Sequence, residues 1–79
     1  MSIGDRLKEE RERIGLSQEK LGAVGGVQKR AQINYEAGVR HPDAAYLSAV
    51  AEAGLDVLYI LTGQRGQPVP ATAALPPRL

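Results

Sequence analysis

Residues 16–38 read LSQEKLGAVGGVQKRAQINYEAG, and the fold is decided by this stretch. Ser17 is a good N-cap, and the acidic side chain two positions later suits the positive end of a helix. Two consecutive glycines at 25–26 end that helix after about two turns, and Gly38 ends a second one. The stretch therefore predicts two short helices, joined by a tight glycine turn, over about residues 17–24 and 28–37.

Three further helices are expected around this pair. Ser2 and Asp5 have the spacing of a capping box, and apolar residues recur on one face as far as Ile14. Pro42 and Asp43 form a turn that begins a later helix. No strand pattern appears, so we predict an all-α bundle of five short helices, the remaining three lying over about residues 3–14, 44–53 and 57–62. The inward side chains of the middle helices are expected to be Leu21, Val24, Leu47, Val50 and Ala51.

The composition changes after Gly63. Residues 64–79, QRGQPVPATAALPPRL, contain four prolines and no acidic residue, and they show little periodicity. Such a segment cannot bury a core. We expect one domain at residues 1–63, followed by a flexible or extended proline-rich tail at residues 64–79.

Length and composition exclude several classes of protein. The chain has 79 residues, no cysteine and a single histidine, His41. We therefore expect no disulfide, metal, cofactor or small-molecule ligand, and no enzyme, because a phosphate loop and a paired acid site are also missing. No apolar run approaches the roughly 20 residues that span a bilayer, and the charged N-terminus lacks a signal-peptide apolar region. A cytoplasmic protein is expected. The net charge of +1 gives no argument for nucleic acid, which requires local positive charge.

Two short helices joined by a glycine turn are the sequence form of a helix-turn-helix. The chain resembles the lambda-repressor and Cro-like family, also called the XRE family, whose pattern is Leu-Ser-Gln-Glu-x-Leu-Ala, then Gly-Val, then Tyr-Glu-x-Gly-x-x-x-Pro. Residues 55–63, LDVLYILTG, resemble the closing helix of the family, so the resemblance covers residues 3–63. The pattern is carried here by Leu16, Ser17, Gln18, Glu19, Leu21, Gly26, Val27, Tyr35, Glu36, Gly38 and Pro42.

The resemblance implies a sequence-specific transcriptional regulator of phage or bacterial type. It implies a repressor that acts as a homodimer on a pseudo-palindromic DNA operator, and that is nucleoid-associated when bound. Leftover apolar surface and family analogy make Leu55, Leu58 and Tyr59 candidates for the dimer interface. The resemblance also implies a partly buried salt bridge between Arg11 and Glu36.

The helix at 28–37 has two chemically different faces. Successive helical residues are about 100° apart, so Val27, Ala31 and Tyr35 share a face that we assign to the core. The opposite face combines donors for guanine or phosphate, an amide for adenine and an apolar contact for thymine. It consists of Lys29, Arg30, Ile33, Asn34 and Ala37.

Residues outside this face complete the expected DNA contacts. Gln28 lies at the N-terminal tip, where base contacts concentrate in this motif, and Arg40 is placed for a phosphate. The resemblance implies that Gln18 bridges the DNA backbone and the recognition helix, and that Ser17 with adjacent amides holds a phosphate. The full set of DNA-binding candidates is Ser17, Gln18, Gln28, Lys29, Arg30, Gln32, Ile33, Asn34 and Arg40.

Three positions depart from the family pattern. Gln28 replaces the usual Ser or Thr cap, and Gly22 replaces a small Ala at a cost of about 1 kcal/mol in helix propensity. Gln32 occupies a slot that usually holds an inward Ile or Val, and Ile33 follows one residue late. Either Gln32 turns inward and forms hydrogen bonds, or the helix is rotated so that Ile33 packs and Gln32 faces the DNA.

A protein-interaction module, such as an antirepressor or an antitoxin-type partner, is the alternative function. That hypothesis predicts that alanine at Lys29, Arg30 and Asn34 leaves activity intact. On that hypothesis the proline-rich tail is the segment to delete instead.

Overall fold

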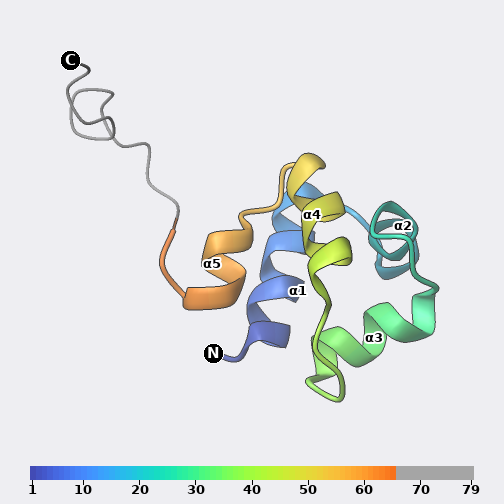
Figure 1. The fold of residues 1–79 in the computed structure, drawn as a ribbon, viewed down its shortest axis with the longest axis horizontal. Helices are drawn as coiled ribbons and strands as arrows, with labels where there is room; N and C mark the ends of the chain where they lie inside the picture. The colour runs from blue at the N-terminus through green and yellow to red at the C-terminus, as the bar shows by residue number, and fades with distance from the viewer. Residues whose placement is uncertain (66–79) are drawn as a thin grey trace.

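The computed structural model describes residues 1–65, which form five helices and contain no strand. The all-α prediction is confirmed (Figure 1), and three of the observed helices are one terminal residue shorter than predicted. The helices are α1 (Ile3–Ile14), α2 (Gln18–Val24), α3 (Lys29–Ala37), α4 (Ala44–Glu52) and α5 (Val57–Thr62). None of the helices within these residues has the length and apolarity needed to cross a bilayer.

Local capping explains where most of the helices begin. The capping box at α1 is present, because Ser2 Oγ accepts from the Asp5 amide at 3.1 Å and the Asp5 carboxylate accepts from the Ser2 amide at 3.2 Å. The Ser17 hydroxyl caps α2 by accepting from the Lys20 amide at 3.1 Å. Gln28 makes no side-chain capping bond to α3, as expected for a residue that replaces Ser or Thr.

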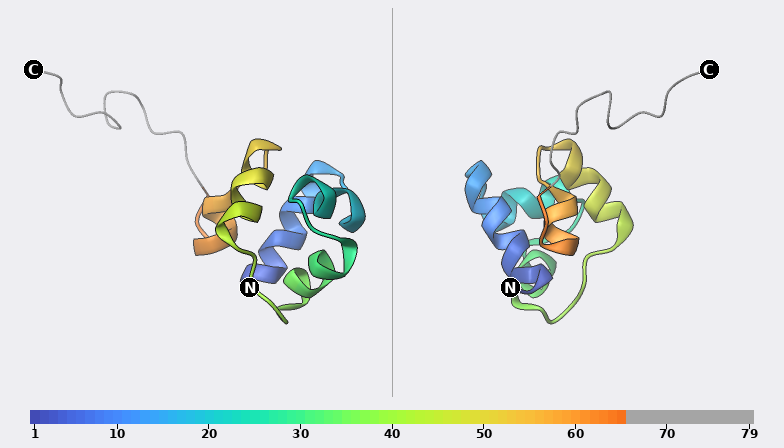
Figure 2. Two further views of the ribbon diagram at one scale, coloured as in Figure 1. Left: turned by 45° about the vertical axis from the view of Figure 1, so that its right-hand side comes forward. Right: turned by 90° about the vertical axis from the view of Figure 1, so that its left-hand side faces the viewer.

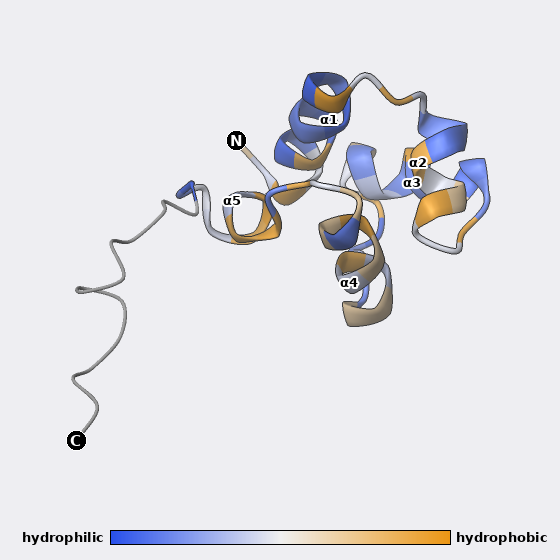
Figure 3. Cartoon of the chain, turned by 90° about the horizontal axis from the view of Figure 1, so that it is seen from above, coloured by the Kyte–Doolittle hydropathy of each residue, from blue (hydrophilic) through white to orange (hydrophobic). Residues whose placement is uncertain are grey.

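The helices are arranged so that α2 and α3 lie at one end of the bundle and α5 lies at the other (Figure 1, Figure 2). α1 packs against both α3 and α5 and so connects the two ends. Coloured by hydropathy, α1 is largely hydrophilic, whereas α5 is largely hydrophobic (Figure 3). This arrangement leaves one side of α3 without a neighbouring helix.

One hydrophobic core lies between the helices, and it consists of Leu7, Leu21, Tyr35, Tyr46, Val50, Leu55 and Ile60. The prediction of an inward side chain is wrong for Val24 and Ala51, because both are exposed. The buried stripe of α4 centres on Tyr46 and Val50, four residues apart, and Ala51 is turned about 100° away from it. In α2 the buried residues are Leu21 and Gly22, which leaves Val24 at the edge of the stripe.

A very close approach joins α1 to the end of α3. A Cβ atom at Gly4 would lie 2.5 Å from the backbone oxygen of Glu36 and 2.6 Å from that of Tyr35. Real side chains do not tolerate such distances, so glycine is required for the two helices to meet in this way. The contact fixes the C-terminal end of α3 against the N-terminal turn of α1.

A buried carboxylate, Glu10, connects α1 to the start of α5. Its oxygens accept two hydrogen bonds from Arg13, at 3.0 and 2.9 Å, and one from the Asp56 amide at 2.8 Å. Arg65 contacts the same carboxylate at 2.5 Å. The hydrogen bonds from Arg13 are the main cause that lowers the pKa of Glu10 to about 2.

The described chain continues past the expected domain boundary at Gly63. Arg65, which the composition placed in the tail, lies 3.8 Å from the centre of the Tyr59 ring and pairs with Glu10. The first residues of the expected tail therefore pack on α1 and α5. The rest of that segment, residues 66–79, lies outside the described residues.

Candidate nucleic-acid interface

The side of α3 that no other helix covers carries four of the nine predicted DNA-binding residues. Lys29, Arg30, Ile33 and Ala37 are exposed there, and Asn34 is half-buried at the edge. Steps of about 100° place these residues on one continuous arc of the helix. The opposite arc packs against the bundle through Ala31, Gln32, Tyr35 and Glu36.

The structure decides between the two orientations that the sequence left open at Gln32. This side chain is fully buried, and its Nε2 donates to Glu36 Oε2 at 2.7 Å, while its Oε1 accepts a hydrogen bond from the Tyr46 hydroxyl. Gln32 therefore turns inward, and its assignment to the DNA-facing set is wrong. Ile33 stays on the outer face with 37% of its surface exposed.

Glu36 is the acceptor at the centre of this buried polar network. Arg11 donates to its carboxylate through Nε at 2.7 Å and through Nη2 at 3.1 Å, and the two side chains are only 12% and 4% exposed. The pair implied by the family resemblance is thus formed between α1 and α3. The hydrogen bonds to Glu36 raise the pKa of Arg11, so the guanidinium stays charged at any physiological pH.

The network also reaches the start of α2. Gln18 is half-buried, and its Nε2 donates to Glu36 Oε1 at 3.2 Å. Arg11 Nη1 donates to the Leu16 carbonyl oxygen at 2.9 Å, which holds the segment that leads into α2. Ser17 is exposed at the N-cap. The N-terminal end of α2 is therefore held at a fixed position relative to α3.

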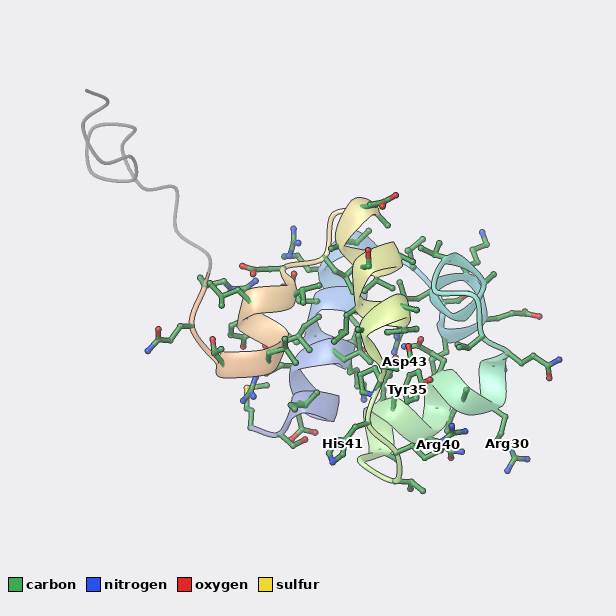
Figure 4. All side chains as sticks on the ribbon, viewed as in Figure 1. Arg30, Tyr35, Arg40, His41 and Asp43 are labelled. Carbon is green, nitrogen blue, oxygen red and sulfur yellow. The ribbon has the colours of Figure 1, made fainter. Side chains whose placement is uncertain are left out.

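Basic side chains extend the outer face of α3 into the loop that follows. Arg30 points away from the bundle, and Arg40 and His41 lie along the same lower edge of the molecule in this view, whereas Tyr35 lies between α3 and α4 (Figure 4). Arg30, Arg40 and His41 are all exposed. Gln28, at the N-terminal tip of α3, is exposed as well.

The family model for helix-turn-helix proteins matches residues 7–54, which is more than half of the chain. The chain belongs to the helix-turn-helix family. It is also similar to the crystal structure of the P22 c2 repressor protein in complex with synthetic operator 9T in the presence of Tl⁺, with a TM-score of 0.73 and 26% identity. That match covers 81% of this chain and 98% of the repressor chain. No curated protein matches the chain.

These findings identify the molecule as a lambda-repressor-like, XRE-family helix-turn-helix protein. Family and fold are those of DNA-binding regulators and not of enzymes. The resemblance inferred from the Leu-Ser-Gln-Glu and Tyr-Glu-x-Gly segments is therefore confirmed. The five helices lie within one residue of the bounds that the caps, glycines and periodicity predicted.

The structure changes the set of candidates for a dimer interface. Leu55 is only 4% exposed and belongs to the core, so it is unsuited to contact a partner. Leu58 is 52% exposed, and Leu61, which sequence reasoning missed, is exposed beside it on α5. Tyr59 is half-buried and donates a hydrogen bond to Glu9.

Sequence reasoning also missed the role of Tyr46. Its hydroxyl is the partner of Gln32, although the two residues lie in different helices and are 14 positions apart. A usable signal was present, because a glutamine in an apolar slot requires a hydrogen-bonding partner. A tyrosine four residues before Val50, on the buried stripe of α4, is a suitable donor.

Proposed function

We propose that this helix-turn-helix regulator is a transcriptional repressor that binds a pseudo-palindromic operator as a homodimer, with α3 in the major groove. One observation carries the proposal. The outer face of α3 presents donors and an amide but no carboxylate, because Glu36, the acidic residue of this helix, is buried against Arg11. Such a face suits the bases and phosphates of DNA.

The proposed base contacts follow from the chemistry of each exposed side chain. Asn34 pairs through its amide with adenine, Lys29 or Arg30 donates to guanine, and Ile33 packs on a thymine methyl group. Gln28 reaches a base from the N-terminal tip of the helix. These side chains carry the sequence preference of the regulator.

The proposed phosphate contacts surround the recognition helix. Arg40 lies beyond its C-terminal end, and Ser17 and Gln18 lie at the start of α2. Contacts of this kind fix the position of a protein on the duplex without reading its sequence. The similar P22 c2 repressor is described in complex with a synthetic operator, which supports DNA as the partner.

The homodimer is proposed to form through α5. Leu58 and Leu61 are exposed there, at the end of the bundle away from α3. A twofold axis at this surface makes the same residues meet in both copies and leaves both recognition helices free. Two copies then present their α3 helices about 34 Å apart, one turn of DNA. We place the protein in the cytoplasm, on the nucleoid when bound.

Selection of bound DNA from a random pool tests the sequence preference. The expected result is one enriched sequence with two half-sites in inverted order. Alanine at Lys29 or Asn34 relaxes the selection, whereas alanine at Lys8, an exposed residue of α1, leaves it unchanged. A pool without an enriched sequence contradicts the proposal and favours a protein-interaction module instead.

Sedimentation of the protein on the selected DNA tests the dimer. We expect two copies on each site, and a change of Leu58→Glu is expected to leave one copy per site with weaker binding. Ser48→Glu adds the same charge to an exposed position of α4 and is expected to keep two copies. Two copies on DNA with Leu58→Glu contradict the α5 interface.

A further inference from the structure

Tyr46 of α4 contacts α3 and the turn between α2 and α3. Its ring lies against Gly25, where a Cβ atom would come within 2.3 Å of a ring carbon. The same ring packs at its edge on Tyr35 of α3, with centroids 4.9 Å apart and planes at 71°. Its hydroxyl donates to Gln32 Oε1. A single side chain of α4 therefore touches α3 at two points and the α2–α3 turn at a third.

Gln32 continues this contact into the polar network. Its amide accepts from Tyr46 at one end and donates to Glu36 at the other, so both ends of the amide are used. Among residues 1–65, no buried side-chain polar atom lacks a hydrogen-bonding partner. The bond to Glu36 lies within α3 and orients the amide, whereas the bond from Tyr46 joins α3 to α4 and holds α3 against rotation about its own axis.

Rotation of α3 decides which side chains face outward. Turning the helix by about 100°, one residue, would bring Ile33 into the inward place of Gln32 and move Gln32 into the half-buried place of Ala31. That alternative breaks the hydrogen bond between Gln32 and Tyr46 and leaves the Tyr46 hydroxyl unpaired in the core, whereas the bond from Gln32 to Glu36 lies within α3 and can persist. The buried pair thus opposes this rotation and keeps Ile33 on the outer arc.

We propose that Gln32 and Tyr46 are positioning residues which determine the DNA sequence preference of this regulator without touching DNA. The proposal rests on the proposed function of α3 as the recognition helix. The buried pair holds α3 at the rotation in which its exposed side chains match the selected bases. Loss of the pair lets the helix change its rotation, so base contacts weaken while phosphate contacts remain.

Three variants separate this role from a purely structural one. Tyr46→Phe removes the hydrogen-bond donor and keeps the ring against Gly25. Gln32→Met removes both hydrogen bonds of the Gln32 amide and keeps a side chain of nearly the same length. The double variant Gln32→Met/Tyr46→Phe replaces both partners by apolar groups, which leaves no unpaired polar group in that contact and keeps the domain folded. Val50→Ala is the matched control, because Val50 is fully buried in α4 and forms no part of the polar network.

The measurement is the ratio of two dissociation constants. The dissociation constant for DNA with one base pair of each half-site exchanged is divided by that for the DNA selected by the wild-type protein. A smaller ratio therefore means a weaker sequence preference. Binding is measured at a temperature at which circular dichroism shows each variant to be folded. Affinity for random DNA is measured in parallel, because phosphate contacts dominate it.

We expect each of the three variants to reduce this ratio about tenfold, the effect of one misaligned base contact, with affinity for random DNA unchanged. Val50→Ala is expected to lower stability and keep the ratio. The proposal is overturned if the folded double variant keeps the wild-type ratio. It is also overturned if Val50→Ala lowers the ratio as much as the three variants do. A wild-type protein that selects no sequence contradicts the proposed function itself, which distinguishes that failure from failure of the positioning role.

Discussion

Arg11 of α1 and Glu36 of α3 form a two-point ion pair in the interior of the domain, with Nε and Nη2 at 2.7 and 3.1 Å from the two carboxylate oxygens. The pair has two consequences. It fastens the C-terminal half of α3 to α1, and it removes the negative charge of Glu36 from the surface of the proposed recognition helix. The same contact therefore supports the fold and the electrostatics of the proposed DNA-binding face.

Replacing Arg11 by methionine tests the structural part of this contact. The change leaves the buried Glu36 carboxylate without its cationic partner, and we expect a loss of about 3–5 kcal/mol in the free energy of unfolding. Urea unfolding measures the loss. Lys8→Met, at an exposed position of the same helix, is the control and is expected to stay within about 0.5 kcal/mol of wild type. A loss below about 1 kcal/mol for Arg11→Met is the result expected of an exposed pair instead.

Two glycine-to-alanine changes test the close approach of α1 and α3. Both glycines lie inside helices, where alanine alone gains about 1 kcal/mol. At Gly4 the new Cβ would meet the Glu36 backbone oxygen at 2.5 Å, whereas at Gly22 the nearest atom, the Val27 oxygen, is at 3.1 Å. We expect Gly4→Ala to destabilise the domain by about 1–3 kcal/mol and Gly22→Ala to stay within about 1 kcal/mol of wild type. Thermal unfolding of the two variants compares them, and equal stabilities would contradict the packing described for Gly4.

Salt dependence separates phosphate contacts from base contacts. Arg40→Ala removes a proposed phosphate contact, so it is expected to weaken binding to every DNA sequence and to lower the slope of log affinity against log salt by about 1. Asn34→Ala removes a proposed base contact, so it is expected to keep the slope and to lose about 1–3 kcal/mol of preference for the selected site. Fluorescence anisotropy over a range of salt concentrations measures both quantities. An Arg40→Ala variant with the wild-type slope would place Arg40 away from the phosphates.

Acid should destabilise the domain through Glu10. Its folded-state pKa of about 2 lies below the ordinary value of 4.5, so the ionised carboxylate stabilises the folded state above pH 4.5. That contribution is lost as the pH falls from 4.5 toward 2. We expect Glu10→Gln to be less stable than wild type at neutral pH and to show a flatter decline across this range in urea unfolding. Parallel profiles for the two proteins would mean that Glu10 titrates normally.

The positions of the helices could be predicted from the sequence because their signals are local. Ser2, Ser17 and Asp43 cap the helices that follow them, and glycines end most of the helices at the predicted places. The outer face of α3 could also be predicted, since the spacing of Lys29 and Arg30 relative to the core residues fixes their side of the helix.

Features that depend on contacts between helices could not be predicted in the same way. The inward orientation of Gln32 depends on Tyr46 in another helix, and helical spacing alone allowed both rotations. Glu10 lies in a run of charged residues, EERER at 9–13, and nothing in that run distinguishes a buried carboxylate from a solvated one. Family analogy and leftover apolar surface point to Leu55 as a partner contact, and the loop before α5 has no periodicity from which its burial could be inferred.

The most direct test of the central claim compares affinity for selected and random DNA. The wild-type protein is titrated with the DNA that it enriches from a random pool and with shuffled DNA of the same length, at about 0.15 M salt so that non-specific attraction is screened. We expect the selected DNA to bind at least about a thousandfold more tightly, and alanine at both Lys29 and Asn34 to remove most of that difference. Equal affinity of the wild-type protein for the two DNAs would contradict the assignment of α3 as a sequence-reading helix.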